Sequence, residues 1–374
     1  MSYGLLYIIL MLYQLLKFSR RLNYMLMSQV YLKEKDLSFY PNWEKIFGNS
    51  NPIFVEIGVG KGDFIVEIAK TNQGANFVGV DYCREILRKA VKKVEQLQLT
   101  NVRLLPMEGA KFLCKVFTSE TISGVYLNFP DPWVKHKQAK NRLVNQAFTW
   151  LLADRLKLNG FFRMSTDYKP YLEETVAFFL NTKAFQPLWD EIIRTDVEDY
   201  IPTKYSKKWL SLGFALYFTG FKKIKRVEIP EWVKDYYPLL KITKEDLLPI
   251  LCTIKLNQLP DFTKLSQNLP KGVLYKEGEN VIKVLDIFVK KDGVLLDLLV
   301  KEGSVVERFF IRISPYTING LILSSHEATP PDPLDYVHLA FVLLCKKILE
   351  IFPSAEILKT TCKQKLVKEH LFRS

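Results

Sequence analysis

A carboxylate between two prolines marks the part of the chain best suited to chemistry. Asp131 lies in the hexapeptide Asn128–Trp133, which follows the apolar run Ile122–Leu127. Such a run is typical of a buried strand in a parallel sheet, and the prolines end it because proline cannot continue a central ladder. Ligands of open α/β sheets bind at the carboxyl ends of the strands, so Asp131 could act on a substrate there. Alternatively, Asp131 only caps the next segment.

A cluster of cations follows this turn, and the whole chain is basic. The cluster consists of Lys135, Lys137, Lys140 and Arg142. Over the full sequence, 53 Lys+Arg residues against 40 Asp+Glu residues give a net charge of +13. Cationic surfaces gain affinity for nucleic acids because binding releases counterions from the phosphates. The composition therefore favours a nucleic acid as partner over a membrane or an acidic protein, with ordinary solubility charge as the alternative.

Further candidate ligand positions follow three apolar runs nearer the N-terminus. The run from Ile53 leads into Gly58, Gly60 and Gly62, where the small side chain lets the backbone turn sharply against a ligand. This G-x-G-x-G spacing differs from the G-x-G-x-x-G of dinucleotide folds. The second apolar run ends just before Asp81, and the third ends shortly before Glu108-Gly109. An acid at the position of Asp81 can accept both ribose hydroxyls of an adenosine ligand.

The alternation of strands and helices predicts an α/β fold with a doubly wound, Rossmann-like sheet. A chain of 374 residues exceeds one ordinary domain, and 48% hydrophobic residues suffice for packed cores. Strand-like runs with turn signals between Val273 and Leu323, then a helix, predict a second, smaller α+β domain. We expect an N-terminal extension (1–45), the doubly wound domain (46–224), a linker (225–240) and the α+β module (241–374).

The order of the motifs resembles the tRNA (guanine-N7-)-methyltransferases of the bacterial TrmB type. The motifs are E-I-G-x-G-x-G, F-P-D-P-W-x-K, S-T-D-Y and P-T-K-Y followed by L-G, and the resemblance covers about Ile53 to Lys223. It implies the class I S-adenosylmethionine methyltransferase fold and methyl transfer from S-adenosylmethionine to N7 of the guanosine at tRNA position 46. It implies neither a metal nor a catalytic cysteine or histidine, since guanine N7 has an exposed lone pair.

The resemblance also assigns roles to residues at the matching motif positions. Asp131 is placed at the reaction centre. Substrate binding falls to Lys135, Lys140, Arg142, Asp167 and Thr203, and methyl-donor binding to Glu56, Gly58, Gly60, Asp81, Glu108 and Gly109. The chain departs from the family pattern at Gln138, Asn141 and Ser206. Ser206 replaces the glutamate of a T-x-x-E motif, which puts one contact in doubt.

Two rival functions stay open: a non-catalytic tRNA-binding protein, or a methyltransferase acting on a different substrate such as a small amine or a protein. The five cysteines form no metal-like spacing, and we expect a reduced, cytoplasmic setting. The apolar stretch Tyr3–Leu16 is shorter than a membrane span, so we expect a mis-called translation start or a helix packed on the body, with a membrane anchor as the less favoured alternative. The α+β module could extend the tRNA-binding surface, stabilise the chain or dimerise it. The sequence leaves monomer and homodimer open.

Overall fold

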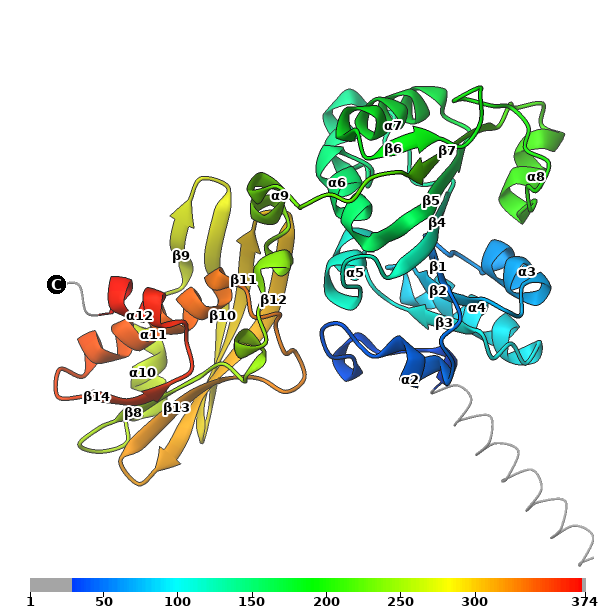
Figure 1. Cartoon of the computed structure of the whole chain (residues 1–374). Helices are drawn as coiled ribbons and strands as arrows, with labels where there is room; N and C mark the ends of the chain where they lie inside the picture. Colours follow the sequence, from blue (N-terminus) through cyan, green and yellow to red (C-terminus); the bar gives the residue numbers. More distant parts are fainter. Residues whose placement is uncertain (1–28, 372–374) are drawn as a thin grey trace, which may run out of the picture. The chain divides into compact units, whose positions relative to one another are not determined.

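The chain forms two compact units, one ending at Pro230 and one beginning at Glu231. The structure, a computed structural model, describes residues 29–371 (Figure 1). The expectation for Tyr3–Leu16 therefore lies outside the described residues. Within them, no helix is long and apolar enough to cross a membrane. The range 225–240, expected as a linker, contains helix α9 (Glu231–Tyr236) of the second unit, which buries Val233.

The first unit is built on a seven-stranded sheet with the order β3-β2-β1-β4-β5-β7-β6. The first five strands in this order are parallel, and β7 runs antiparallel to β5 and β6. The order reverses between β1 and β4, which is the point where doubly wound sheets bind ligands. The strands are β1 (Ile53–Ile57), β2 (Asn76–Val80), β3 (Val102–Leu105), β4 (Ile122–Asn128), β5 (Leu156–Thr166), β6 (Phe185–Pro187) and β7 (Tyr217–Lys223).

Helices cover both faces of this sheet, as expected for a doubly wound fold (Figure 1). Helices α3 and α4 pack together against β2 and β3, and α5, α6 and α7 form the opposite layer. Periodic apolar residues explain the packing; Leu87, Ala90, Val91 and Val94 of α4, for example, are all buried. The helices are α2 (Trp43–Phe47), α3 (Asp63–Thr71), α4 (Arg84–Gln96), α5 (Gly109–Val116), α6 (Gln146–Arg155), α7 (Lys169–Thr182) and α8 (Lys204–Ser211).

Local contacts set the boundaries of α6 and β7. Helix α6 begins at Gln146 because the Asn145 side chain caps it by accepting from the Phe148 amide. Residues His136–Asn141, before this cap, form a separate 3-10 helix, η2. Strand β7 begins only at Tyr217, since Phe214 completes the end of α8.

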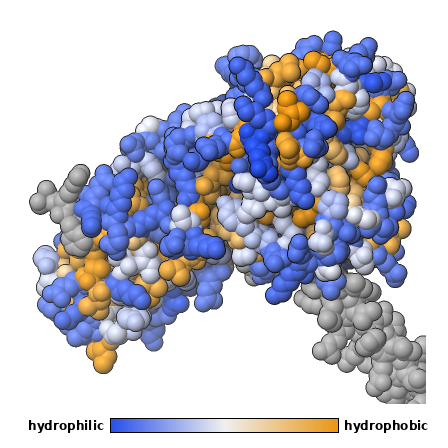
Figure 2. All heavy atoms as spheres, viewed as in Figure 1, coloured by the Kyte–Doolittle hydropathy of each residue, from blue (hydrophilic) through white to orange (hydrophobic). Residues whose placement is uncertain are grey.

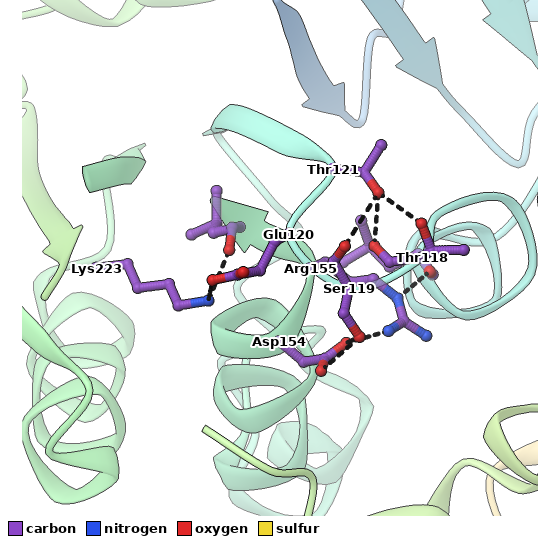
Figure 3. Close-up of polar contacts among 9 residues, drawn as sticks. Thr118, Ser119, Glu120, Thr121, Asp154, Arg155 and Lys223 are labelled. Carbon is purple, nitrogen blue, oxygen red and sulfur yellow. Dashed lines mark hydrogen bonds and ion pairs between the residues drawn. The ribbon is translucent and has the colours of Figure 1, made fainter. Parts of the chain in front are cut away.

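Buried charges join the strands at the amino edge of the sheet, opposite the ligand-binding edge (Figure 3). Lys223 is 1% exposed, donates to the Leu156 carbonyl at 2.7 Å and pairs with Glu120 at 3.4 Å. Asp154 accepts from Ser119 and pairs with Arg155, both of the pair being buried at the end of α6. These contacts fasten the last residue of β7 to the segments that enter β4 and β5.

The second unit is a seven-stranded antiparallel sheet with the order β14-β8-β13-β12-β11-β10-β9. The turns predicted at Gly278, Gly293 and Gly303 connect β9 to β12 as successive hairpins, and helix α11 (Asp335–Ile351) buries nine of its residues. Helices α10 (Phe262–Asn268) and α12 (Gln364–His370) complete the unit. The strands are β8 (Leu251–Lys255), β9 (Gly272–Glu277), β10 (Asn280–Lys290), β11 (Gly293–Glu302), β12 (Val305–Thr317), β13 (Gly320–Ser325) and β14 (Glu356–Thr360).

Gly62 tests how tightly α3 packs on α4. Its φ is +78°, and an added Cβ would lie 2.7 Å from the Cβ of Ala90. Gly62→Ala should therefore lower the free energy of unfolding of the first unit by about 1–3 kcal/mol. Urea denaturation, with the transition assigned by hydrogen exchange in β1 and β2, measures this. Gly48→Ala is the control, because Gly48 also has a positive φ, +75°, but an added Cβ there meets nothing within 4 Å; equal effects of the two variants would contradict the packing argument.

Candidate active site

The glycine loop after β1 leaves room for a ligand. Gly58 and Gly60 have φ values of +80° and +55°, and a Cβ added at either would meet nothing within 4 Å. The amides of Gly58 and Val59 donate to the Val80 carbonyl at 2.8 and 3.1 Å, which fixes the loop at the end of β2. Gly62 differs because it faces Ala90 of α4. The first two glycines therefore form an open backbone cradle, and the third serves helix packing.

Glu56 precedes this cradle and carries an uncompensated buried oxygen. The side chain is 4% exposed, and its Oε1 accepts from Asn128 Nδ2 at 3.3 Å. Asn128 Oδ1 in turn accepts from Ser165 Oγ at 2.9 Å, so one hydrogen-bonded row crosses β1, β4 and β5. Oε2 has no partner within residues 29–371. Burial raises the pKa of Glu56 well above its usual value, against the lowering effects of Asn128 and of the Ile65 backbone. A cationic group would satisfy this oxygen.

Asp81 and Glu108 lie at the ends of the next two strands, as predicted, and each already accepts backbone hydrogen bonds. Asp81 accepts from Gly60 N at 2.8 Å and from Cys83 N at 2.9 Å, which ties it to the glycine loop. Glu108 caps α5 by accepting from Ala110 N and Lys111 N. Gly109 is buried, and an added Cβ would lie 2.6 Å from Ile57 Cγ2. Their part in cofactor binding stays a prediction.

The turn that carries Asp131 is strained. Phe129 and Trp133 have φ values of +51° and +42°, which are rare for residues other than glycine. The Phe129 amide donates to the Ser165 carbonyl at 2.8 Å, so the turn is anchored to the end of β5. Asp131 itself is exposed. The strain and the anchor together present this carboxylate at the carboxyl edge of the sheet.

Arg142 stabilises this turn from inside the protein. Its Nε donates to the Pro132 carbonyl at 2.9 Å, and its guanidinium pairs with Glu174 at 2.7 Å. The guanidinium also lies 4.9 Å from the ring centroid of Tyr171, and its side chain is only 9% exposed. These contacts give Arg142 a structural role in the turn, and its part in substrate binding stays a prediction. Lys135 and Lys140 are exposed on and beside η2, where a phosphate backbone can reach them.

Tyr205, which the sequence analysis did not select, joins the acidic residues of the site. Its hydroxyl donates to Asp167 Oδ2 at 3.1 Å, and its ring lies 5.0 Å from that of Phe129. Burial raises the pKa of Tyr205, and the charges of Asp167 and Asp131 raise it further. Tyr205 is thus hydrogen-bonded to Asp167 and lies within the electrostatic influence of Asp131. The only signal in the sequence was the position of Tyr205 within the P-T-K-Y motif.

Ser206 and Thr203 form the N-terminal cap of α8. Thr203 Oγ1 accepts from the Ser206 amide at 3.1 Å, and Ser206 Oγ accepts from the Thr203 amide at 2.9 Å. This reciprocal pair is a capping box, whose usual sequence is S/T-x-x-E or Q. The T-x-x-E spacing expected at this position has that same form. Ser206 therefore supplies the capping contact that a glutamate would make, and the departure at this position leaves the helix start intact.

Comparison with known proteins places the first unit in a family. A family model described as "Putative methyltransferase" matches residues 50–219. The tRNA (guanine-N(7)-)-methyltransferase of Geobacter metallireducens is 32% identical over 197 residues, which cover 52% of this chain and 93% of the relative. The chain belongs to the tRNA (guanine-N(7)-)-methyltransferase family. The member from Listeria innocua is 33% identical over 189 residues, covering 50% of this chain and 87% of the relative.

Solved structures of methyltransferases also align with this chain. An antibiotic-related methyltransferase gives a TM-score of 0.37 at 18% identity, covering 49% of this chain and 92% of that one. The 30S ribosomal A1408 methyltransferase from an uncultured bacterium gives the same TM-score at 21% identity and the same coverage. The strand order of the first unit, in which β7 is antiparallel to its neighbours, confirms the predicted Rossmann-like sheet independently of these alignments.

The capping box predicts a local effect of Ser206. Ser206→Ala removes the acceptor for the Thr203 amide, so the helix α8 should lose about 1 kcal/mol of local stability. Hydrogen–deuterium exchange should become faster in α8 and stay unchanged in α3. Ser211→Ala is the matched control, since Ser211 Oγ donates to the Lys208 carbonyl at the exposed end of the same helix. If both variants exchange alike, the capping role of Ser206 is wrong.

Proposed function

We propose that the protein transfers a methyl group from S-adenosylmethionine to N7 of a tRNA guanosine, the one at position 46 in the variable loop. The observation that carries the proposal is the hydrogen-bonded row from Glu56 through Asn128 to Ser165. It joins the open glycine cradle after β1 to the acidic turns after β4 and β5. The proposed donor and acceptor sites would then be neighbours at the point where the strand order reverses.

The residues of the cradle fit the proposed methyl donor. Glu56 offers a buried, unpartnered oxygen to a cationic group, and the open space above Gly58 and Gly60 admits a ligand against the backbone. Asp81 would accept from ribose hydroxyls, and Glu108 and Gly109 would lie along the adenine. S-adenosylmethionine, when bound, supplies an electrophilic methyl group on a sulfonium. Within residues 29–371, no three metal-ligating side chains come together.

The acidic turns suit a guanine acceptor. The N7 lone pair needs no base to free it, so catalysis can rest on positioning and on stabilising the positive charge that the purine gains. Asp131 would accept from the guanine N–H groups and offset that charge. Asp167, held by the Tyr205 hydroxyl, would do the same or keep α8 in place. Thr203 would contribute to substrate binding indirectly, by capping α8 and so keeping this helix in position.

The distribution of charge supports tRNA binding by the first unit. Residues 231–374 contain 20 Lys+Arg and 18 Asp+Glu, so they contribute only +2 of the net +13. The remaining +11 belongs to the part of the chain that holds the site. Lys135 and Lys140, with Lys137, would bind phosphates beside Asp131. The α+β unit has no comparable excess of charge, which favours a stabilising or dimerising role for it. We place the reaction in the cytoplasm.

Methyl transfer to an unmodified tRNA transcript tests the proposal, with nucleoside analysis of the product. Asp131→Asn should lower kcat/KM at least about 100-fold, because a neutral amide cannot offset the charge on the purine. Asp292→Asn, an exposed carboxylate in the second unit, should act like the wild type. A transcript without the position-46 guanosine should yield no 7-methylguanosine.

Two results would contradict the proposal. Binding of tRNA without any methylated nucleoside would favour the non-catalytic tRNA-binding protein. Labelled product in protein or small amines, but not in tRNA, would favour a methyltransferase with a different substrate.

A further inference from the structure

Helix α8 presents apolar side chains to solvent beside the proposed site. Apolar residues interrupt the largely polar surface of the protein in several places (Figure 2). In residues 207–215, every side chain except Trp209 is exposed. The exposed fractions of the three large apolar residues are 51% for Leu210, 58% for Leu212 and 52% for Phe214. We call Lys207, Lys208, Leu210, Leu212 and Phe214 the α8 tip.

The helix that carries this tip is stabilised by its own ends rather than by burial. Of the eight residues of α8, all of them described, Ser206 alone is buried. The capping box closes the N-terminal end. At the other end the Gly213 amide donates to the Leu210 carbonyl and the Phe214 amide to the Trp209 carbonyl. This pair of bonds is a Schellman motif, and the Trp209 and Phe214 rings pack at 4.7 Å in support. A short helix capped at both ends holds its exposed side chains in a fixed arrangement.

The charge of this segment identifies the class of partner. No aspartate or glutamate occurs between Asp199 and Glu228. Lys204, Lys207 and Lys208 are all exposed on α8. A polyanion complements such a surface, because each neutralised phosphate releases a counterion. Lysines beside aromatic and aliphatic side chains are also the combination that binds unpaired nucleotides through their phosphates and base faces.

The position of α8 connects this surface to the reacting base. Tyr205, in the first turn, donates to Asp167 and packs on Phe129 of the acidic turn. A helix rises about 1.5 Å per residue, so Lys207 and Leu212 of the tip lie about 3 and 10 Å along the axis from Tyr205. Those distances are within one or two nucleotides of a guanine bound by Asp131 and Asp167.

We propose that the α8 tip binds the nucleotides next to the target guanosine once that base has left its stack. The inference rests on the proposed function. A guanosine inside folded tRNA must be exposed before it can react, which leaves apolar faces of neighbouring bases open to water. Leu210, Leu212 and Phe214 cover these faces, and Lys207 and Lys208 hold the adjoining phosphates. The tip thereby lowers the cost of opening the tRNA at this position.

The double variant Leu210→Gln/Leu212→Gln tests the tip, since glutamine keeps the length of the side chain and suits a helix. It should lower kcat/KM for folded tRNA about tenfold. For a short single-stranded RNA with the same guanosine, kcat/KM should change less than about twofold, because no stack has to open. Leu358→Gln is the matched control, a leucine 56% exposed on β14. Lys207→Ala/Lys208→Ala should weaken the binding of both RNAs and make that binding less dependent on salt concentration.

Other outcomes overturn the inference. Equal losses on the two RNAs, or no loss on either, would show that the tip does not assist opening. A change in oligomeric mass by light scattering, with RNA kinetics unchanged, would make the tip a contact between copies of this chain. If the wild type forms no 7-methylguanosine, the proposed function is wrong, but the role of the tip in tRNA binding can still be tested. Filter binding of tRNA to the wild type and to the leucine variant then makes that test. A tenfold weaker Kd of the leucine variant supports it there, and an unchanged Kd rejects it.

Discussion

An unpaired buried carboxylate oxygen sets the main constraint on this protein. Removing a carboxylate from water is costly unless a charge or hydrogen-bond donors compensate it. Asn128 donates to one oxygen of Glu56 and the backbone of Ile65 also stabilises its charged form, but the second oxygen has no hydrogen-bond partner within the described part of the chain. The sheet places this oxygen where β1 opens into the glycine cradle, so a cationic ligand there would remove the penalty.

The acceptor side of the site depends on contacts between segments far apart in the sequence. The strained turn that presents Asp131 is anchored by the Ser165 carbonyl and by Arg142, which pairs with Glu174 of α7. Helix α8 adds Tyr205, which links Asp167 to the ring of Phe129. Because α8 buries so little surface, its caps decide whether Tyr205 stays in this position. The caps of α8 thereby support a site whose other residues come from the ends of several strands.

Much of this arrangement could be predicted from the sequence, because strand ends and glycine spacing are local signals. The strand that contains Glu56 and the strands before Asp81, Glu108 and Asp131 all lie where their apolar runs indicated. The side-chain partners could not be predicted in the same way. Nothing in the sequence distinguishes a phosphate-binding arginine from Arg142, whose partners lie up to 32 residues away. From the sequence, Ser206 indicated the loss of a contact that the family's glutamate makes. Its capping role could not be predicted, because that role depends on the geometry of the backbone at the start of α8.

Proton release on binding of S-adenosylmethionine tests the role of Glu56 most directly. Burial raises the pKa of this carboxyl and a bound cation favours its ionised form, so binding at a pH below the raised pKa should release a proton. Titration calorimetry in buffers of different ionisation enthalpy should therefore detect proton release. The affinity should rise with pH until the raised pKa is passed, and Glu56→Gln should abolish both effects and weaken binding. Binding that releases no proton, or that Glu56→Gln leaves unchanged, would contradict the account.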